Sequence, residues 1–382
     1  MTEAIKVFKK SSPNGKITAY LCRRDFVDNL TRVSPVEGAV VVDGDYLRDR
    51  KVFARVSLTY RYGREEDEVM GLNFSKEYEL VKLEVTPPGG TEAWPAGGTM
   101  ARLLEKLGEA AARPFTLLLP KDTPPSVTLE PGAEGTSKKL GVIYELMLYV
   151  AENAEDQPHR RNSVTLAVRK IQRAPDKPSG RQPQILVSKG FTLHPGKLRL
   201  EVYLDRDLYY HGQSLEPHVS ILNASKKTVK YILHQVVQHV EITMTNTNFS
   251  RIVASIESRD GCPIIPNSSF SRTIALTPLA CRAFGVALDG QIQDKDATLA
   301  SSTIMSASRS ASDALGIIVS YSLRVRLNCG ALGGELVAEI PFKLMHPDPY
   351  SSQEAYKSVD SLEFEEFSVL RRGRSISDEL ED

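Results

Sequence analysis

Hydrophobic and polar residues alternate along most of this chain. In residues 51–62, 197–205 and 321–328, apolar side chains occupy every second position and polar side chains stand between them. A period of two places the apolar residues on one face of a half-buried strand, as in antiparallel sheets. Turn-forming clusters such as 12–15 (SPNG) and 195–197 (PGK) separate the strands. Many short strands with this spacing predict an all-β protein built from β-sandwiches.

One segment, residues 99–108, departs from this period. Its apolar residues recur at the spacing of an amphipathic helix, with Thr99 as the expected N-cap and Gly108 as the stop; they are Met100, Leu103, Leu104 and Leu107. We therefore expect one short helix in the first part of the chain. It has two interpretations: a lid over one end of a sandwich, or a docking surface for another segment.

The chain divides at residues 172–184. This stretch holds three prolines and one glycine and has no apolar periodicity, so it is interpreted as a hinge between domains. The pattern predicts an N-terminal sandwich over 1–171 and a C-terminal sandwich over 185–345. Residues 346–382 carry ten acidic and four basic side chains and form an expected C-terminal tail.

Composition narrows the functional class. The 48 basic and 48 acidic residues balance, so no global charge favours nucleic acid or membrane binding. Four scattered cysteines without CxxC spacing fit a reducing compartment. The charged N-terminus is unlike a signal peptide, and no run of about 18 apolar residues occurs. A soluble cytoplasmic protein is expected. No GxSxG, P-loop, HExxH or dinucleotide-binding pattern is present, so we expect no enzyme and no cofactor.

Three aspartates lie close together in the segment 285–302: Asp289, Asp294 and Asp296. The segment lacks the EF-hand spacing, and the seven histidines of the chain show no ligand spacing, so no metal site is predicted. His211, in the turn sequence YYHG, is interpreted as structural. A calcium-dependent lipid-binding sandwich uses clustered aspartates too, and it stays open as an alternative.

Arg169 follows the alternating run 164–168 with the parity shifted by one, which suggests that its side chain points inward. A buried arginine needs a carboxylate partner, and Asp25 and the aspartates of 285–302 are candidates. Surface salt bridges are the alternative.

Basic residues gather near the N-terminus, where residues 1–30 hold six basic and three acidic side chains. Lys9, Lys10 and Arg24, with the sequence HRRNS at 159–163, form a candidate patch for phosphorylated segments, which such residues bind through charge-assisted hydrogen bonds. Ordinary solvated charge is the alternative.

Several stretches resemble the arrestin family, and most of all its invertebrate visual, rhodopsin-binding members. They include RRDFVD at 23–28, YGREEDE at 62–68, LDGQIQDKD at 288–296 and LASST at 299–303, and the resemblance covers about 1–370. It implies two sandwiches of immunoglobulin type and binding to an activated, phosphorylated G-protein-coupled receptor, with rhodopsin as the expected one. Arrestins exclude the G protein and so terminate the signal. The protein is then expected in the cytoplasm, recruited to the photoreceptor membrane.

The resemblance also implies roles for individual residues. An ion-pair switch is carried over to Asp25, Arg169, Asp289 and Asp296. The tail arginine that completes it in the family has Val369 at its usual place, and Arg371 is the nearest substitute. Phosphate sensing is implied for Lys9, Lys10, Arg24, Arg160, Arg161 and Lys295. The receptor-entering finger loop corresponds to Glu68, Val69, Met70, Gly71 and Leu72. The tail-docking residues are Val7, Phe8, Leu103 and Leu107, which receive Phe364 and Phe367.

Three further expectations concern partners and regulation. Phe364, Phe367 and Arg371 fit the F-x-x-F-x-x-x-R pattern by which some arrestins bind the clathrin adaptor complex, so an endocytic adaptor is the alternative function. Ser375 and Ser377 follow arginines and are candidate phosphorylation sites. Lysines at 226, 227 and 230 suggest binding of phosphoinositides or inositol phosphates.

Overall fold

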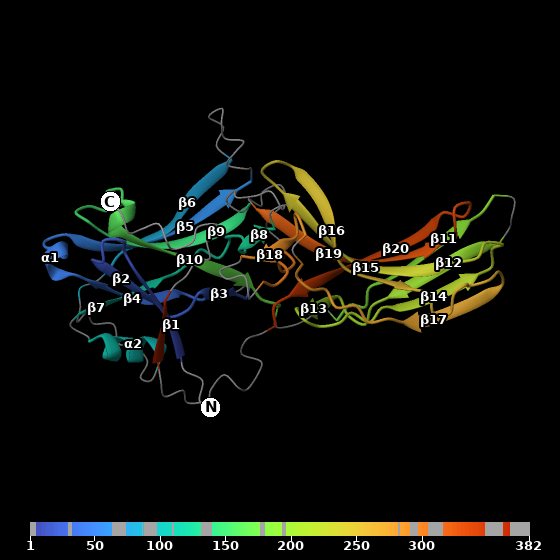
Figure 1. Cartoon of the computed structure of the whole chain (residues 1–382), viewed down its shortest axis with the longest axis horizontal. Coiled ribbons are helices and arrows are strands. Elements are labelled where there is room, and N and C mark those ends of the chain that lie inside the picture. Colours follow the sequence, from blue (N-terminus) through green and yellow to red (C-terminus); the bar gives the residue numbers. More distant parts are fainter. Residues whose placement is uncertain are drawn as a thin grey trace, which may run out of the picture.

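The computed structural model describes residues 5–29, 33–62, 74–85, 87, 98–108, 111–130, 140–175, 180–192, 196–281, 283–290, 297–304, 316–347 and 362–366. Two β-sandwiches lie end to end along the long axis of the molecule, as Figure 1 shows. The prediction of an all-β protein with two sandwiches is confirmed. The four cysteines are all free.

Two sheets form the N-terminal sandwich. The first has the order β21 (Leu362–Glu366), β1 (Ile5–Ser11), β2 (Ile17–Leu21), β4 (Val36–Val42) and β7 (Ala112–Leu117). The second has the order β18 (Ala287–Asp289), β8 (Val127–Leu129), β9 (Gly141–Ala151), β10 (Ser163–Gln172) and β3 (Asp25–Asp28), and β5 (Lys51–Arg61) joins β9 to β6 (Ser75–Glu84). Each sheet therefore contains one strand from the far C-terminal part of the sequence.

Two more sheets form the C-terminal sandwich. One has the order β11 (Gln184–Gly190), β12 (Lys197–Tyr203), β14 (His218–Asn223) and β17 (Ser268–Thr273). The other has the order β13 (Leu208–Tyr210), β20 (Glu335–Met345), β19 (Ile317–Asn328), β15 (Tyr231–Ile242) and β16 (Thr247–Ser258). Strict alternation is clearest in β12, where buried and exposed residues follow one another along the whole strand.

Three strand pairs are parallel, although the sequence pattern predicted antiparallel sheets. They are β1 with β21, β3 with β10, and β13 with β20. Each joins segments separated by more than 100 residues, so no hairpin dictates their direction. The remaining described pairs are antiparallel, as expected.

Among the described residues, α1 (Gly44–Leu47) is a single turn, η2 (Arg160–Asn162) is a 3₁₀ turn, and α2 (Thr99–Leu107) is the predicted amphipathic helix. The N-cap of α2 is Gly98, not Thr99, and no side chain caps it. Gly108 does end the helix: it has a φ of +85° and its N–H donates to the carbonyl of Leu104. The helix packs on the outer face of the first sheet rather than over one end of the sandwich. No described helix is long and apolar enough to cross a membrane.

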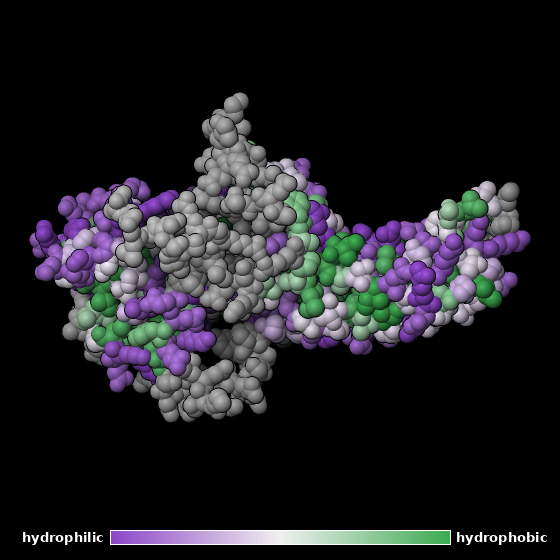
Figure 2. Space-filling view, in the orientation of Figure 1, coloured by the Kyte–Doolittle hydropathy of each residue, from purple (hydrophilic) through white to green (hydrophobic). Residues whose placement is uncertain are grey.

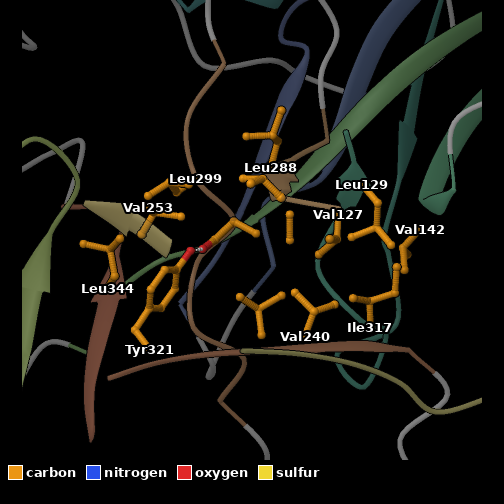
Figure 3. Close-up of a cluster of buried hydrophobic side chains, with 14 of the residues drawn as sticks. Val127, Leu129, Val142, Val240, Val253, Leu288, Leu299, Ile317, Tyr321 and Leu344 are labelled. Atoms are coloured by element: carbon orange, nitrogen blue, oxygen red, sulfur yellow. Dashed lines mark hydrogen bonds between the residues drawn. The ribbon is translucent and has the colours of Figure 1, made fainter. Parts of the chain in front are cut away.

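The two sandwiches share one continuous apolar core at their junction. Strand β18 leaves the C-terminal half of the sequence and pairs with β8, so that Leu288 lies opposite Thr128. Figure 3 shows side chains from both halves packed together there, among them Val127, Leu129, Val142, Val240, Leu288, Ile317 and Tyr321. The buried Tyr321 hydroxyl accepts from Gln238 at 2.7 Å and donates to the carbonyl of Ala300, so this hydroxyl is satisfied inside the shared core.

Figure 2 shows hydrophilic and hydrophobic side chains interspersed over the visible parts of both sandwiches. Inside the C-terminal sandwich, His234 on β15 is 1% exposed, and neither ring nitrogen has a hydrogen-bond partner among the described residues. Burial lowers the pKa of His234 from 6.5 to about 4. Between about pH 4 and pH 6.5, His234 is therefore neutral in the folded protein and protonated in the unfolded chain.

This difference predicts acid instability. As the pH falls below 6.5, His234 becomes protonated in the unfolded chain, but in the folded protein it stays neutral until about pH 4. The folded protein therefore loses stability between these two pH values. The loss from His234 alone is about 2 kcal/mol at pH 5 relative to pH 7.5. We expect His234→Leu to remove it, and urea unfolding at both pH values measures the effect. The control His218→Leu, at a half-buried position on β14, should keep the wild-type pH dependence. An equal dependence in wild type and His234→Leu would contradict the assignment.

Candidate functional site

Arg169 and Asp25 form a bidentate ion pair between the parallel strands β10 and β3, where they are direct register partners. The Arg169 Nε donates to Asp25 Oδ1 at 2.8 Å, and the Nη2 donates to Oδ2. The side chains are 13% and 40% exposed. This geometry is the strongest form of the arginine–carboxylate interaction, yet the carboxylate stays accessible to solvent.

The residue whose side chain enters the N-terminal core is Lys170, not Arg169. Lys170 has the strand parity of the buried Val168, whereas Arg169 points to the other face of β10. The Nζ of Lys170 lies 2.9 Å from Asp28 Oδ2 and donates to the carbonyl and hydroxyl of Thr123. The side chain of Lys170 is 1% exposed and that of Asp28 is 9% exposed. The sequence analysis missed this pair, although the parity of Lys170 relative to 164–168 was a usable signal.

Asp289 does not form the direct ion pair with Arg169 that the sequence analysis expected. Its carboxylate accepts from the Ser301 N–H at 3.1 Å, hydrogen-bonds His346 Nε2 and lies 3.9 Å from His211 Nε2. The following residue does reach the arginine: a Cβ on Gly290 would lie 3.5 Å from Arg169 Cγ and 2.6 Å from Ser126 Cβ. Only glycine therefore allows the end of β18 to approach so closely.

Burial distinguishes the two histidines at this carboxylate from surface ones. Burial lowers the pKa of His211 to about 4, against the opposing effect of Asp289, so its ring is neutral near pH 7. The rings of His211 and His346 lie 4.5 Å apart, and the Ser301 hydroxyl is 3.2 Å from His211 Nε2. The interpretation of His211 as structural omitted this cluster because its members are distant in sequence.

The basic residues of β1 face an acidic strand of the tail. Lys9 Nζ lies 3.2 Å from Glu366, and Lys6 Nζ lies 3.7 Å from Glu365. Lys10 points to the neighbouring sheet instead and donates to the carbonyl of Thr165 at 2.6 Å. The candidate phosphate-sensing residues Lys9 and Lys10 therefore lie on opposite faces of one strand.

The other candidate phosphate-sensing residues differ in exposure. Arg160 and Arg161 are exposed on η2. Arg24 is 8% exposed, and its guanidinium lies 4.1 Å above the Phe8 ring. Burial raises the pKa of Glu145, as does Glu77, while Lys10, Arg160 and Arg55 oppose this. Glu145 is thus a carboxylate set among the candidate phosphate-sensing residues, and the sequence analysis did not name it.

The described part of the tail, β21, adds to the edge of the first sheet. Leu362 packs against an apolar cluster that contains Val7, Leu103 and Leu107. The Phe364 ring lies 5.1 Å from Tyr20, and Lys106 Nζ lies 4.5 Å from the Phe364 ring centre. Leu362 was missed by sequence reasoning, although its position two residues before Phe364 places both on one face of a strand.

Phe8 does not belong to this docking cluster. Val7 and Phe8 are neighbours on one strand and point to opposite faces, so Val7 faces α2 while Phe8 packs against the main core. The remaining predicted residues lie outside the described part of the chain: Glu68, Val69, Met70, Gly71, Leu72, Lys295, Asp296, Phe367, Arg371, Ser375 and Ser377.

Two β-sandwiches joined through a shared strand, with a C-terminal strand on the N-terminal sheet, define the class of protein: the chain belongs to the arrestin family. The models "Arrestin (or S-antigen), N-terminal domain" and "Arrestin (or S-antigen), C-terminal domain" match residues 17–174 and 194–349. The resemblance inferred from the sequence is confirmed.

Its relatives include invertebrate arrestins. The chain is 52% identical to an "Arrestin homolog" of Locusta migratoria, with 94% of this chain and 90% of the relative covered. It is 51% identical to "Arrestin, lateral eye" of Limulus polyphemus, with 91% and 86% covered. With "Phosrestin-1" of Drosophila melanogaster the identity is 46%, with 95% and 92% covered.

The buried pair predicts a large effect of its disruption. Lys170→Met leaves Asp28 buried without its ammonium partner, which we expect to cost about 3–5 kcal/mol of stability. Replacing both, as Lys170→Met with Asp28→Asn, removes the stranded charge and should recover at least about half of that loss. Urea unfolding of the wild type, Lys170→Met, Asp28→Asn and the double variant measures the double-mutant cycle. The control Lys16→Met breaks the exposed pair with Asp43 and should leave the midpoint unchanged. Additive losses in the double variant would contradict a buried ion pair.

The docking of β21 is testable through its apolar contact. Leu362→Ser removes the side chain that packs against α2, so the tail should detach more often. We expect trypsin to cleave at Lys357 or Arg371 several-fold faster than in the wild type, followed by mass spectrometry. The control Glu363→Ser changes an exposed side chain on the other face of the strand and should leave the rate unchanged. Equal cleavage of both variants would show that Leu362 does not hold the tail.

Proposed function

We propose that this arrestin binds an activated, phosphorylated G-protein-coupled receptor, blocks its G protein and so terminates its signal. The observation that carries the proposal is the acidic strand β21, held on the basic strand β1 through Lys6–Glu365 and Lys9–Glu366. A phosphorylated receptor segment offers the same chemistry with more charge per residue, so it competes with β21 for this edge.

Displacement of the tail is the first step of the proposed mechanism. The ion pairs of β21 are largely exposed, since Glu366 is 74% and Lys9 35% exposed in their side chains. Such pairs contribute roughly 0–1 kcal/mol each. A phosphate, with about −1.5 to −2 charges and three acceptor oxygens, binds lysine more strongly. Lys9 and Lys10 would take up the phosphates while the tail leaves.

Arg169 supplies the second step. Its bidentate partner Asp25 is 40% exposed while Arg169 itself is 13% exposed, so a phosphate that displaces the Asp25 carboxylate would compete for the arginine as an anion. Loss of the Arg169–Asp25 pair would remove a side-chain contact between β3 and β10 and leave their backbone ladder in place. Requiring both events makes full release depend on phosphate and receptor together, as a bistable element biased by local charge. Asp296 and Arg371 are proposed as further members of this switch.

The kind of receptor is inferred from the relatives. One is named an arrestin of the lateral eye, and the chain shares 51% identity with it over 349 residues. We infer a visual role, with rhodopsin as the receptor, and recruitment from the cytoplasm to the photoreceptor membrane. Residues 68–72 are the proposed finger loop and 172–184 the proposed hinge between the sandwiches.

A second candidate function is that of an endocytic adaptor. Phe364 packs on Tyr20 in the docked tail and is 37% exposed there, so release of β21 would open the rest of its ring to a partner. This supports adaptor binding through Phe364, Phe367 and Arg371 after receptor engagement. Pull-down of the clathrin adaptor complex with the free tail, with Phe364→Ala as control, tests it.

The switch predicts a gain of function. Arg169→Glu places a negative charge next to the negative charge of Asp25, so the Arg169–Asp25 pair of the switch should be broken without phosphate. We expect binding to illuminated, unphosphorylated rhodopsin membranes to rise at least about fivefold in a co-sedimentation assay. Dark membranes report the background.

The matched control reverses the pair. Asp25→Arg combined with Arg169→Glu restores opposite charges at the same register position, so phosphate dependence should return. If binding by Arg169→Glu still depends on phosphate as in the wild type, the Arg169–Asp25 pair is not part of the phosphate-sensitive switch. An equal gain in the charge-reversed double variant would show that the effect comes from losing Arg169 itself rather than from breaking the pair.

A further inference from the structure

Three metal-ligating side chains converge beside the domain junction. His211 follows β13, Asp289 ends β18, and His346 follows β20, so the chain brings them together from positions more than 50 residues apart. Their ligand atoms all lie within 4.8 Å of one another. Both histidines turn Nε2 toward the same oxygen, Oδ2 of Asp289.

The carboxylate of Asp289 is buried without a lysine or arginine. Its side chain is 4% exposed, and among the described residues its partners are the two histidines and Ser301. A buried carboxylate is costly unless a positive charge or several hydrogen bonds compensate it. Here the only described source of positive charge is a proton on a histidine.

We propose that His211, Asp289 and His346 form a binding site for a divalent transition-metal ion of the zinc class. Two imidazoles and one carboxylate are a ligand set of zinc sites that keep a fourth position open, whereas calcium and magnesium prefer oxygen ligands alone. The fourth position is available to water beside the Ser301 hydroxyl, which is 3.2 Å from His211 Nε2.

Small movements suffice to bind the ion. Tetrahedral coordination with bonds of about 2.0–2.1 Å places donor atoms about 3.3 Å apart. His211 Nε2 is 3.9 Å from Asp289 Oδ2, and His346 is closer than that spacing because it now hydrogen-bonds the same oxygen. The ion replaces the proton shared by His346 and Asp289. The Ser301 N–H, 3.1 Å from Asp289 Oδ1, orients the carboxylate from outside the ligand shell.

The position of the site gives it a mechanical consequence. The His346 carbonyl accepts from the Ala174 N–H at 3.2 Å, and His346 bridges Arg173 just after β10. Asp289 ends the strand that pairs with β8 of the N-terminal sandwich. A bound ion therefore ties His211 of the C-terminal sandwich to two segments that contact the N-terminal one, and it opposes relative movement of the sandwiches. This inference does not depend on the proposed receptor function.

Cobalt titration of the full-length, metal-stripped protein tests the site. We expect one equivalent of Co²⁺ to produce the intense visible d–d absorption of four-coordination, Zn²⁺ to abolish it by displacement, and Zn²⁺ to raise the thermal midpoint by a few degrees. His211→Gln and His346→Gln should each weaken binding at least about tenfold. The control His218→Gln, on β14, should bind as the wild type does.

Other outcomes overturn the proposal. Absence of stoichiometric binding would do so, as would unchanged affinity in His211→Gln. Near-ultraviolet thiolate charge-transfer bands would assign the ion to cysteines instead. Circular dichroism and the metal-free thermal midpoint report whether each variant folds; if His346→Gln does not, His211→Gln decides alone, because His211 lies in a turn.

Discussion

Strand β18 is the element on which the arrangement of this molecule depends. Three residues from the C-terminal half of the sequence complete the sheet of the N-terminal sandwich by pairing with β8. Their apolar side chains, Ala287 and Leu288, are buried in the core that both halves share (Figure 3). Because this core is apolar and continuous, the two sandwiches cannot separate here without exposing it to water. Any movement between them is therefore expected to keep this contact closed.

The ionic groups around the junction differ in burial, and burial decides what each can do. Lys170 and Asp28 are almost inaccessible, so an external anion has no route to them and their role is structural. Arg169 and Asp25 are close enough for a bidentate bond yet partly exposed, which is the condition for exchange with an incoming phosphate. Asp289 is buried with two histidines and Ser301 as its partners among the described residues. Of these three groups, the Arg169–Asp25 pair is therefore the one most open to an incoming anion.

The sequence predicted what depends on local periodicity and failed where distant segments meet. Period-two alternation located the strands, and the i, i+3, i+4 spacing located α2, because both patterns reflect a single element facing one core. The prediction that the Arg169 side chain points inward was wrong. Side chains two residues apart share one face of a strand, so Lys170, not Arg169, lies on the face of the buried Val168. The cluster of His211, Asp289 and His346 has no local signature: its ligands converge only through sheet topology. The need of a buried arginine for a carboxylate made Asp25 one of several candidate partners, and the family resemblance singled it out, because no spacing relates it to Arg169.

The tail is built to be held weakly. Strand β21 has five residues, lies at the edge of its sheet and contributes one half-buried leucine, an exposed phenylalanine contact and two exposed ion pairs. Each contact adds little, and ordering five residues costs conformational entropy of roughly 1–2 kcal/mol per residue. Because the side-chain contacts of β21 are few and mostly exposed, charge-assisted bonds from a competing anion to β1 shift the equilibrium toward release. A longer or more apolar strand would dock more tightly and could not respond to them, so the brevity and acidity of β21 are what make its release controllable.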